Sequence, residues 1–352
     1  MFLPPITRPV LYLPAKLYEA GVRARAWLYE HGWQEQRQLP APVISVGNVT
    51  VGGTGKTPCV AWLGNYLQAS GHAVAILSRG YKRASQGRVE VSDGKTILCD
   101  AAAAGDEPYL LAQSCPGVRV VVDQDRYAAG QWLSERARVT VFLLDDGYQH
   151  LRLHRSLNLL LVDATDELAE GRMVPFGRLR EPLTAMRRAD AVLVTRADQP
   201  FDQARLEQTV RRYTRPHTPL FYSSHRLTKL HSLTQPVAEP LALDSFVGKA
   251  VAAICGIARP ERFFSDLQQL GMKLVWQQSF PDHHRYTPVE FATILAAAQR
   301  TQATAILTTE KDAANLADLT QSSPLPVYAA QLAFHCPQET ALQALVQRVL
   351  HP

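Results

Sequence analysis

One short segment restricts the possible folds of this 352-residue chain more than any other feature. Residues 51–57 read Val-Gly-Gly-Thr-Gly-Lys-Thr, between an apolar run at Val43–Val46 and a helical pattern at Pro58–Ser70. A strand, a glycine-rich loop, Lys-Thr and a helix in this order are typical of a phosphate-binding loop. The segment therefore predicts an α/β fold of the P-loop NTPase type.

Most residues of the predicted loop have a physical role. Glycines let backbone N–H groups approach a phosphate without a Cβ clash, and the start of the following helix points free N–H groups at the same anion. Lys56 is expected to contact the β- and γ-phosphates of ATP, and the Thr57 hydroxyl to bind Mg²⁺. The usual pattern has glycine where this chain has Thr50. We expect the loop to be formed by Thr50, Val51, Gly52, Gly53, Thr54, Gly55, Lys56 and Thr57.

The chain around the loop alternates strand and helix patterns. Continuous apolar strands of this kind are typical of mostly parallel sheets covered by helices on both faces. They are predicted at Val43–Val46, Val74–Leu77, Val118–Val122, Val139–Leu144, Leu157–Val162 and Ala191–Val194. From about residue 221 to 244 there is no helical period and prolines occur, which predicts an extended linker. A second α/β unit follows, so we expect an N-terminal helix within 1–33, a P-loop domain at 34–226 and a smaller α/β domain at 227–352.

The N-terminal region predicts an amphipathic helix at residues 14–31. Its apolar stripe is formed by Leu13, Leu17, Ala20, Ala24, Trp27 and Leu28. Lys16, Arg23 and Arg25 lie on or beside the other face, and the whole chain has a formal net charge of +5. Such a helix either lies in a membrane interface or packs on the domain, and the pattern leaves both alternatives open. No apolar run reaches the roughly 20 residues that span a bilayer, so any membrane contact is expected to be peripheral.

Two pairs of carboxylates stand where a P-loop protein needs them. The apolar strand at 139–144 ends at Asp145 and Asp146, as in the Walker-B pattern, where an aspartate serves the Mg²⁺ shell. Asp106 and Glu107 open a helix after Gly105. They either cap that helix or supply a base for an attacking hydroxyl and a Mg²⁺ ligand. The residue types do not decide between these roles, nor which of Asp145 and Asp146 lies nearer the metal.

A histidine and three polar segments are further candidates for the site. His283 comes after Asp282 on a loop, where a solvated loop and a histidine that tunes a base are both compatible with the pattern. The three segments, in which function and simple solvation are again both compatible, are Ser78–Tyr81, Pro175–Pro182 and Thr309–Asp312.

Short motifs occur in a fixed order between about residues 43 and 312. They are Ser45–Asn48 with Gly52–Pro58, Ser78–Tyr81, Gly105–Pro108, Asp145–His150, Leu179–Pro182, Gly256–Pro260 with Phe263–Phe264, Asp282–His283 and Thr309–Asp312. Each is short, but their joint order is specific. In this order they resemble the tetraacyldisaccharide 4′-kinase family, the lipid A 4′-kinases.

The resemblance implies two α/β/α domains joined by an extended linker, with the active site in the cleft. It implies transfer of the γ-phosphate of ATP to the 4′-hydroxyl of tetraacyldisaccharide 1-phosphate, which forms lipid IVA at the cytoplasmic face of the inner membrane. The family's catalytic acid falls on Asp106 and its histidine partner on His283. Its Mg²⁺ residues fall on Thr57 and Glu107, with Asp145–Asp146 nearby.

The lipid acceptor implied by the resemblance also bears on partners. It accounts for an N-terminal helix that binds the membrane surface, which nucleotide chemistry alone does not require. We expect no nucleic-acid partner and a monomer. The five cysteines form no C-x-x-C pair, and their odd number fits a reducing cytosol.

Three other classes of P-loop protein are alternatives. A switch or partitioning ATPase often has a lysine where this chain has Val51. A GTPase would read guanine with a T-K-x-D motif, which residues 195–198 match only loosely because Arg196 replaces the lysine. A soluble small-molecule kinase would not need the N-terminal helix.

Overall fold

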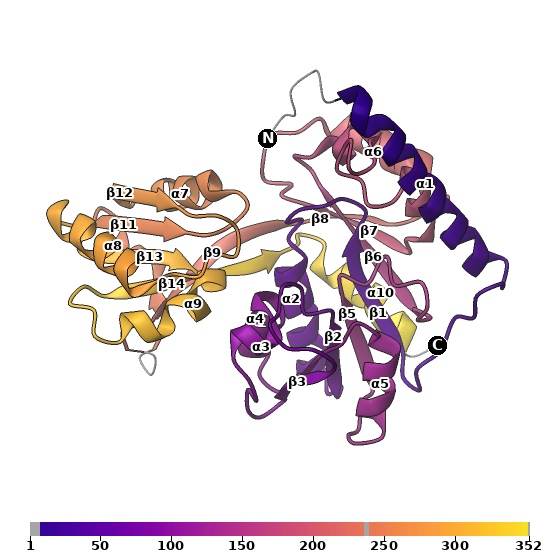
Figure 1. The fold of residues 1–352 in the computed structure, drawn as a ribbon, viewed down its shortest axis with the longest axis horizontal. Coiled ribbons are helices and arrows are strands. Elements are labelled where there is room, and N and C mark those ends of the chain that lie inside the picture. The colour runs from indigo at the N-terminus through magenta and orange to yellow at the C-terminus, as the bar shows by residue number, and fades with distance from the viewer. Residues whose placement is uncertain (1–7, 236–238, 351–352) are drawn as a thin grey trace.

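The structure, a computed structural model, describes residues 8–235 and 239–350. It has two lobes, each built on one sheet, and a helix, α1 (Arg8–Glu30), on the outside of the first lobe (Figure 1). The strands of the first lobe are β1 (Val43–Asn48), β2 (Val74–Ser78), β3 (Val89–Asp93), β4 (Arg119–Val122), β5 (Val141–Asp145), β6 (Leu157–Asp163), β7 (Ala191–Thr195) and β8 (Leu220–Tyr222). Its helices are α2 (Lys56–Ala69), α3 (Ala101–Ala104), α4 (Asp106–Ser114), α5 (Arg126–Ser134) and α6 (Gln203–Tyr213), with 3-10 turns η2 (Glu167–Gly171) and η3 (Leu183–Arg188).

The second lobe follows in the chain. Its strands are β9 (Ser224–Ser232), β10 (Leu241–Ala242), β11 (Ala250–Cys255), β12 (Lys273–Ser279), β13 (Ala305–Thr309) and β14 (Val327–His335). Its helices are α7 (Pro260–Gln269), α8 (Pro288–Arg300) and α9 (Glu310–Thr320), with a 3-10 turn η4 (Leu243–Phe246). A last helix, α10 (Glu339–Leu350), ends the described chain.

The two sheets are mostly parallel. The first has the order β3-β4-β2-β5-β1-β6-β7-β8, in which only the β3–β4 pair is antiparallel among the described strands. The second has the order β10-β9-β14-β13-β11-β12, in which β9 runs antiparallel to both neighbours. This arrangement confirms the predicted α/β class.

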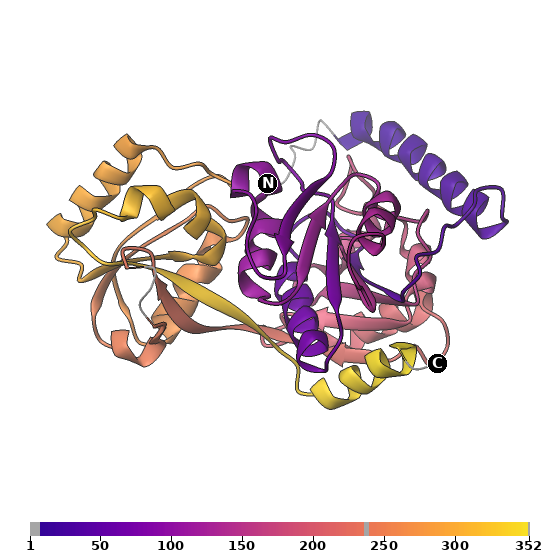
Figure 2. The ribbon, with the colours of Figure 1, turned by 90° about the horizontal axis from the view of Figure 1, so that it is seen from below.

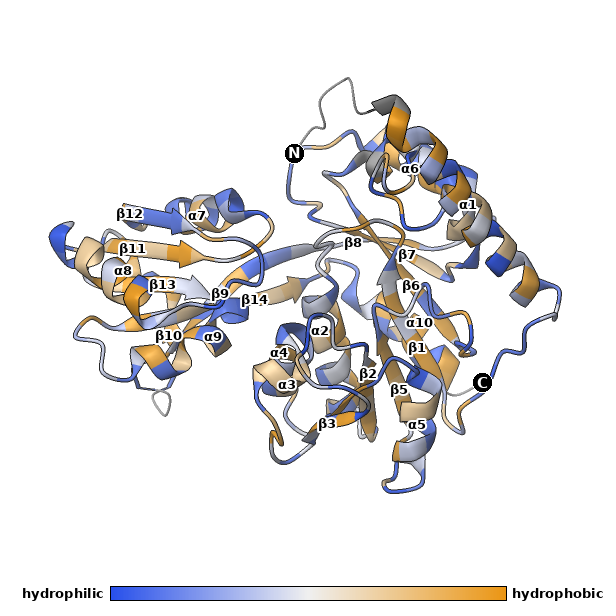
Figure 3. Cartoon of the chain, viewed as in Figure 1, coloured by the Kyte–Doolittle hydropathy of each residue, from blue (hydrophilic) through white to orange (hydrophobic). Residues whose placement is uncertain are grey.

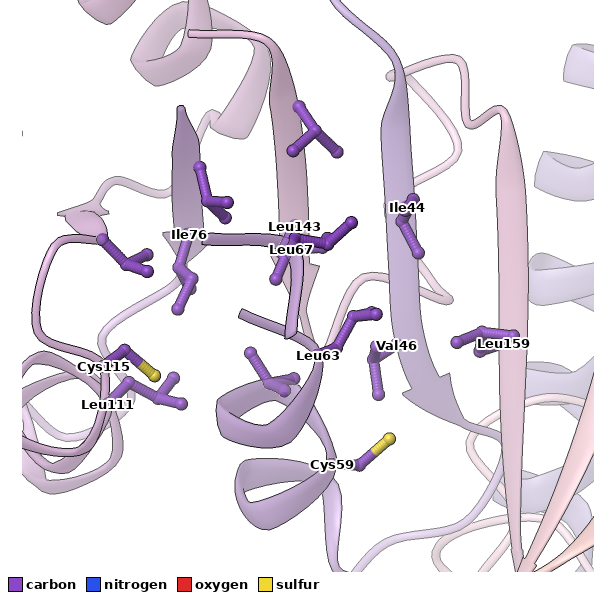
Figure 4. Packing of buried hydrophobic residues seen from close by; sticks show 14 of the residues in the cluster. Ile44, Val46, Cys59, Leu63, Leu67, Ile76, Leu111, Cys115, Leu143 and Leu159 are labelled. Carbon is purple, nitrogen blue, oxygen red and sulfur yellow. The ribbon is translucent and has the colours of Figure 1, made fainter. Parts of the chain in front are cut away.

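Strand β1 occupies the centre of the first sheet, between β5 and β6. All six of its residues are buried, as expected for a parallel strand covered on both faces. Figure 4 shows Cys59 and Leu63 of α2 facing Val46 of β1. Both ends of the intervening loop are therefore anchored in the core.

The connection between the lobes is a two-stranded ribbon. The predicted linker contains β9, which pairs with β14 from Ser224 opposite His335 to Ser232 opposite Tyr328. Polar and apolar residues alternate in this segment, as expected for a strand with one polar and one apolar face. The extended conformation was predicted from the sequence, but the pairing was not, because the partner strand lies about a hundred residues later.

The predicted division of the chain at residue 227 differs from the structure at the C-terminus. Helix α10 returns to the first lobe (Figure 2), where Leu342 and Val346 join the same core as Cys59. Trp62 Nε1 of α2 also donates to Glu339 Oε1 at 3.1 Å. The apolar stripe of α10 thus covers α2, and these residues belong to the core of the first lobe.

Helix α1 begins before the predicted residue 14 and contains Pro14. Proline in a helix removes one backbone hydrogen bond, and here the ring lies on the exposed side. Ala15 is the one buried side chain among those described for this helix, and Figure 3 shows apolar residues along its length. Among the described helices, none is long and apolar enough to cross a membrane.

Candidate active site

The predicted phosphate-binding loop follows β1 and ends where α2 begins. Gly55 precedes α2 with a φ of 77°, and no described side chain caps this helix start. Such a start leaves backbone N–H groups without partners, which favours an anion. The Lys56 side chain is buried, and its Nζ lies 3.4 Å from Asn48 Oδ1 and 3.5 Å from Asp146 Oδ1. An open helix start and a positioned ammonium group together suit the phosphates of a nucleotide.

The other residues of the loop differ in exposure. Gly52 and Gly53 are exposed, Thr57 is half-buried and Thr54 is buried. The Thr54 hydroxyl has no hydrogen-bond partner among the described residues, whereas Thr50 Oγ1 accepts a hydrogen bond from Asn48 at 3.2 Å. The loop is thus open to solvent at Gly52 and Gly53 and held at its start.

Two arginines bind the carbonyl groups of the loop. Arg178 Nη2 donates to Val51 O at 3.1 Å, and Arg196 Nη2 donates to Gly53 O at 2.5 Å. Arg196 has a positive φ of 58° and also pairs with the buried Asp163. Neither contact was predicted, because nothing in the spacing of these arginines indicates the loop. They fix the loop's backbone through its carbonyl groups. Val51 N in turn donates to Arg178 O at 2.7 Å.

His225 of β9 packs directly on the loop. A Cβ built on Gly55 would lie 2.1 Å from His225 Cε1. Burial, and then the charges of Arg196 and Arg262, lower the pKa of His225 to about 4, so the ring is neutral at pH 7. The ribbon between the lobes therefore touches the loop. No motif indicates this contact, because the two segments lie far apart in the chain.

Asp145 is a buried carboxylate with too few partners. Ser78 Oγ donates to its Oδ2 at 2.9 Å, but Oδ1 has no hydrogen-bond partner among the described residues. Burial, and then the charges of Glu107 and Asp146, raise the pKa of Asp145 to about 7. A site with this surplus of negative charge fits a divalent cation, since carboxylate oxygens are preferred Mg²⁺ ligands.

Asp146 has a different environment. Its Oδ2 lies 2.7 Å from Arg180 Nη1, and its φ of 51° is unusual for a residue other than glycine. Burial opposes its ionisation, but Lys56 and Arg180 hold the pKa of Asp146 below its usual value. The charge of Asp146 is thus balanced by Lys56 and Arg180. Asp145 is therefore the carboxylate that would gain more from binding a metal ion.

Asp106 and His283 meet across the two lobes. His283 Nδ1 lies 2.8 Å from Asp106 Oδ2, and both side chains are about 14% exposed or less. Burial opposes the ionisation of Asp106, but His283, with Lys311, lowers the pKa of that carboxyl. Asp106 is the first residue of α4, whose start has Gly105 and no described capping side chain. The carboxylate therefore faces His283 and does not cap the helix.

Arg126 is a buried residue of the site that was not predicted. It is 8% exposed, and its Nε has no partner among the described residues. Burial, and then the nearby charge of Arg79, lower the pKa of Arg126, while Asp146 and Asp145 act in the opposite direction. Arg79 was singled out in the sequence, but a single arginine at the start of α5 has no distinguishing pattern. Two neighbouring guanidinium groups suit an anionic ligand.

Comparisons with known proteins agree on one family. The family model described as Tetraacyldisaccharide-1-P 4′-kinase matches residues 7–351. The chain belongs to this family. The tetraacyldisaccharide 4′-kinase of Geobacter sulfurreducens is 44% identical over 346 residues, which cover 97% of this chain and 93% of the relative. That of Geobacter metallireducens is 41% identical over 352 residues, which cover 98% and 100%.

A solved structure agrees with the 4′-kinase assignment. The crystal structure of LpxK from Aquifex aeolicus in complex with ATP has a TM-score of 0.80 and 35% identity, covering 97% of this chain and 99% of that chain. The predicted family and enzyme class are thereby confirmed. Membership in the 4′-kinase family decides against the switch ATPase, the GTPase and the soluble small-molecule kinase.

Proposed function

We propose that this 4′-kinase transfers the γ-phosphate of ATP to the 4′-hydroxyl of tetraacyldisaccharide 1-phosphate, forming lipid IVA at the cytoplasmic face of the inner membrane. The observation that carries the proposal is the 2.8 Å contact between Asp106 Oδ2 and His283 Nδ1. It places a carboxylate, oriented by the second lobe, on the helix that packs beside α2. Transfer to a hydroxyl needs such a group to accept the proton.

The phosphates of ATP are bound by the loop at residues 50–57. Free N–H groups at the start of α2 face the anion, and Lys56 supplies a positive charge that the contacts with Asn48 and Asp146 hold in place. Arg178 and Arg196 hold the loop's backbone. Phosphoryl transfer depends on this positioning and charge neutralisation more than on covalent chemistry.

Mg²⁺ is assigned to the carboxylates opposite the loop. Asp145 and Glu107 are the proposed carboxylate ligands, Thr57 supplies a hydroxyl, and Asp146 completes the acidic set. The unpartnered Asp145 Oδ1 supports this assignment. When bound, the ion neutralises charge on the β- and γ-phosphates.

Asp106 is the proposed general base, and His283 orients it. The carboxylate accepts the proton of the 4′-hydroxyl as that oxygen attacks the γ-phosphorus and the bond to ADP breaks. Because Asp106 belongs to the first lobe and His283 to the second, the pair exists only when the lobes are together. Proton acceptance by the oriented carboxylate is thereby tied to the closed arrangement of the two lobes.

Helix α1 is proposed to hold the enzyme on the membrane. Most of its predicted apolar stripe points to solvent and not to the lobe: Leu13 is 65% exposed, Leu17 67% and Trp27 47%. This exposure favours the interfacial alternative over packing. Tyr18 Oη donates to Arg180 O at 3.1 Å, so the helix is tied to the loop that pairs with Asp146. A lipid acceptor would therefore reach the site from the side of α1.

The experiment that tests the base is Asp106→Ala. We expect ATP affinity, measured by calorimetry, to change little and kcat for lipid phosphorylation to fall at least about tenfold, within the range of general-base catalysis. Asp100→Ala is the matched control, because this exposed carboxylate in the same segment only caps α3. Unchanged turnover of Asp106→Ala would remove Asp106 from the mechanism.

A further inference from the structure

We propose that Lys311, in the segment Thr309–Asp312, is a positioning residue that fixes the ring of His283 as its neutral Nδ1–H tautomer. The inference deepens the proposed function and rests on the pairing of Asp106 with His283. Lys311 and His283 both belong to the second lobe. That lobe would therefore fix the tautomer of the His283 ring that contacts Asp106 of the first lobe.

The contacts at the ring decide which nitrogen carries the hydrogen. Lys311 Nζ lies 3.3 Å from His283 Nε2 and 2.8 Å from Asp282 Oδ1. An ammonium group donates hydrogen bonds and cannot accept them, so Nε2 must present its lone pair. Asp282 Oδ2, at 3.8 Å from Nε2, is beyond hydrogen-bond distance and does not compete. Nδ1 therefore carries the hydrogen and donates to Asp106 Oδ2 at 2.8 Å.

This tautomer determines the roles in the proposed pair. Because the Nε2 lone pair of His283 is engaged by Lys311, the ring is not free to act as a base, and Asp106 is. An Nε2–H ring would turn a lone pair toward the Asp106 carboxylate and repel it. The hydrogen bond from Nδ1 instead leaves Asp106 ionised, with its second oxygen available to the acceptor hydroxyl.

The loop that carries His283 is also held from α9. His283 has a φ of 66°, a conformation that persists in a residue other than glycine only where the surroundings impose it. His283 N donates to Gly256 O at 3.2 Å, and Gly256 N donates to Asp312 Oδ1 at 3.0 Å. Asp312 is 2% exposed and also accepts from Tyr286 Oη at 3.2 Å. The backbone of His283 is thus fixed by Asp312, and its ring by the neighbouring Lys311.

The test is Lys311→Met, which keeps the length of the side chain and removes the donor. Protein labelled with ¹⁵N-histidine reports the tautomer, and the His283 signals are assigned by their loss in His283→Ala. We expect wild type to show a protonated Nδ1 and an unprotonated Nε2, and Lys311→Met to show a mixture of tautomers. Turnover of Lys311→Met should fall about tenfold, well short of the ~10⁴-fold loss where an orienting group forces the wrong tautomer.

Two further variants serve as controls. Lys311→Arg keeps a donor and should recover most of the turnover and the single tautomer. Lys273→Met changes an exposed lysine of the same lobe and should alter neither. KM for ATP should stay within about twofold in all three lysine variants, because a positioning role acts on the proton acceptor and not on nucleotide binding.

The outcomes separate this inference from the proposed function. An Nε2–H ring in wild type, or the same tautomer and turnover in Lys311→Met, would overturn the role of Lys311. A higher KM for ATP with an unchanged tautomer would also overturn it, since Lys311 would then contact the nucleotide. Unchanged turnover in His283→Ala would overturn the proposed pair itself. The spectra of wild type report the tautomer of His283 whether or not the protein turns over.

Discussion

Replacement of Gly55 by alanine tests the contact between the ribbon and the phosphate-binding loop. The new methyl group would lie 2.1 Å from His225 Cε1 and 2.7 Å from Nε2, so the ring or the loop must move. Gly55 is half-buried but the His225 side chain is buried, and overpacking such a side chain costs about 1–3 kcal/mol. The φ of 77° adds about 1–2 kcal/mol for an L side chain. We therefore expect Gly55→Ala to lower the free energy of unfolding of the nucleotide-free protein by about 2–5 kcal/mol.

Urea unfolding of four variants separates the two contributions. In a His225→Ala background the overpacking is relieved and the backbone strain remains, so Gly55→Ala should then cost only about 1–2 kcal/mol. Gly53→Ala is the matched control, because no described atom lies within 4 Å of the place its new methyl group would take and its φ is not positive; its effect should stay within about 0.5 kcal/mol. Equal losses for Gly55→Ala and Gly53→Ala would refute the reasoning. A loss for Gly55→Ala that is the same with and without His225 would show that His225 is not the obstacle.

Two further predictions concern the acidic site and the helix. Since the pKa of Asp145 is raised to about 7, the folded metal-free protein keeps a proton that the unfolded chain releases near pH ~4. The contribution of this group to stability should therefore fall as the pH rises from about 4 to about 7. Asp145→Asn should remove that pH dependence from the Tm measured in EDTA. Identical pH profiles of Tm for wild type and Asp145→Asn would contradict the prediction. The double variant Leu13→Glu, Leu17→Glu should co-sediment with anionic vesicles at least about tenfold more weakly. A leucine side chain that becomes buried in the membrane contributes roughly 1.5–3 kcal/mol to the free energy of binding. The control for this double variant is Val289→Glu, at a 77% exposed site on the second lobe. Equal co-sedimentation of the double variant and the control would refute an interfacial α1.

The local parts of the fold could be predicted from the sequence. The strand, loop and helix around Lys56 follow from glycine spacing and apolar periodicity, and the structure places them as expected. Asp145 and Asp146 were located at a strand end for the same reason. The choice between them was not possible, because it depends on Arg180, which reaches Asp146 from another part of the chain.

Contacts between distant segments could not be predicted from patterns. Asp106 and His283 are 177 residues apart, and their pairing came only from the family resemblance. The contact of His225 with Gly55 is set by how the ribbon crosses the first lobe. The return of α10 to the first lobe likewise depends on the surface that α2 offers, which local periodicity does not encode.

The measurement that tests the central claim most directly is transfer of ³²P from [γ-³²P]ATP to tetraacyldisaccharide 1-phosphate in detergent micelles, with Lys56→Ala as control. We expect wild type to yield labelled lipid and Lys56→Ala to yield almost none, because the proposed role of the buried Lys56 ammonium group is to hold the transferred phosphate. ATP hydrolysis by wild type without labelled lipid would contradict the account, since the phosphate-binding loop would then serve another acceptor.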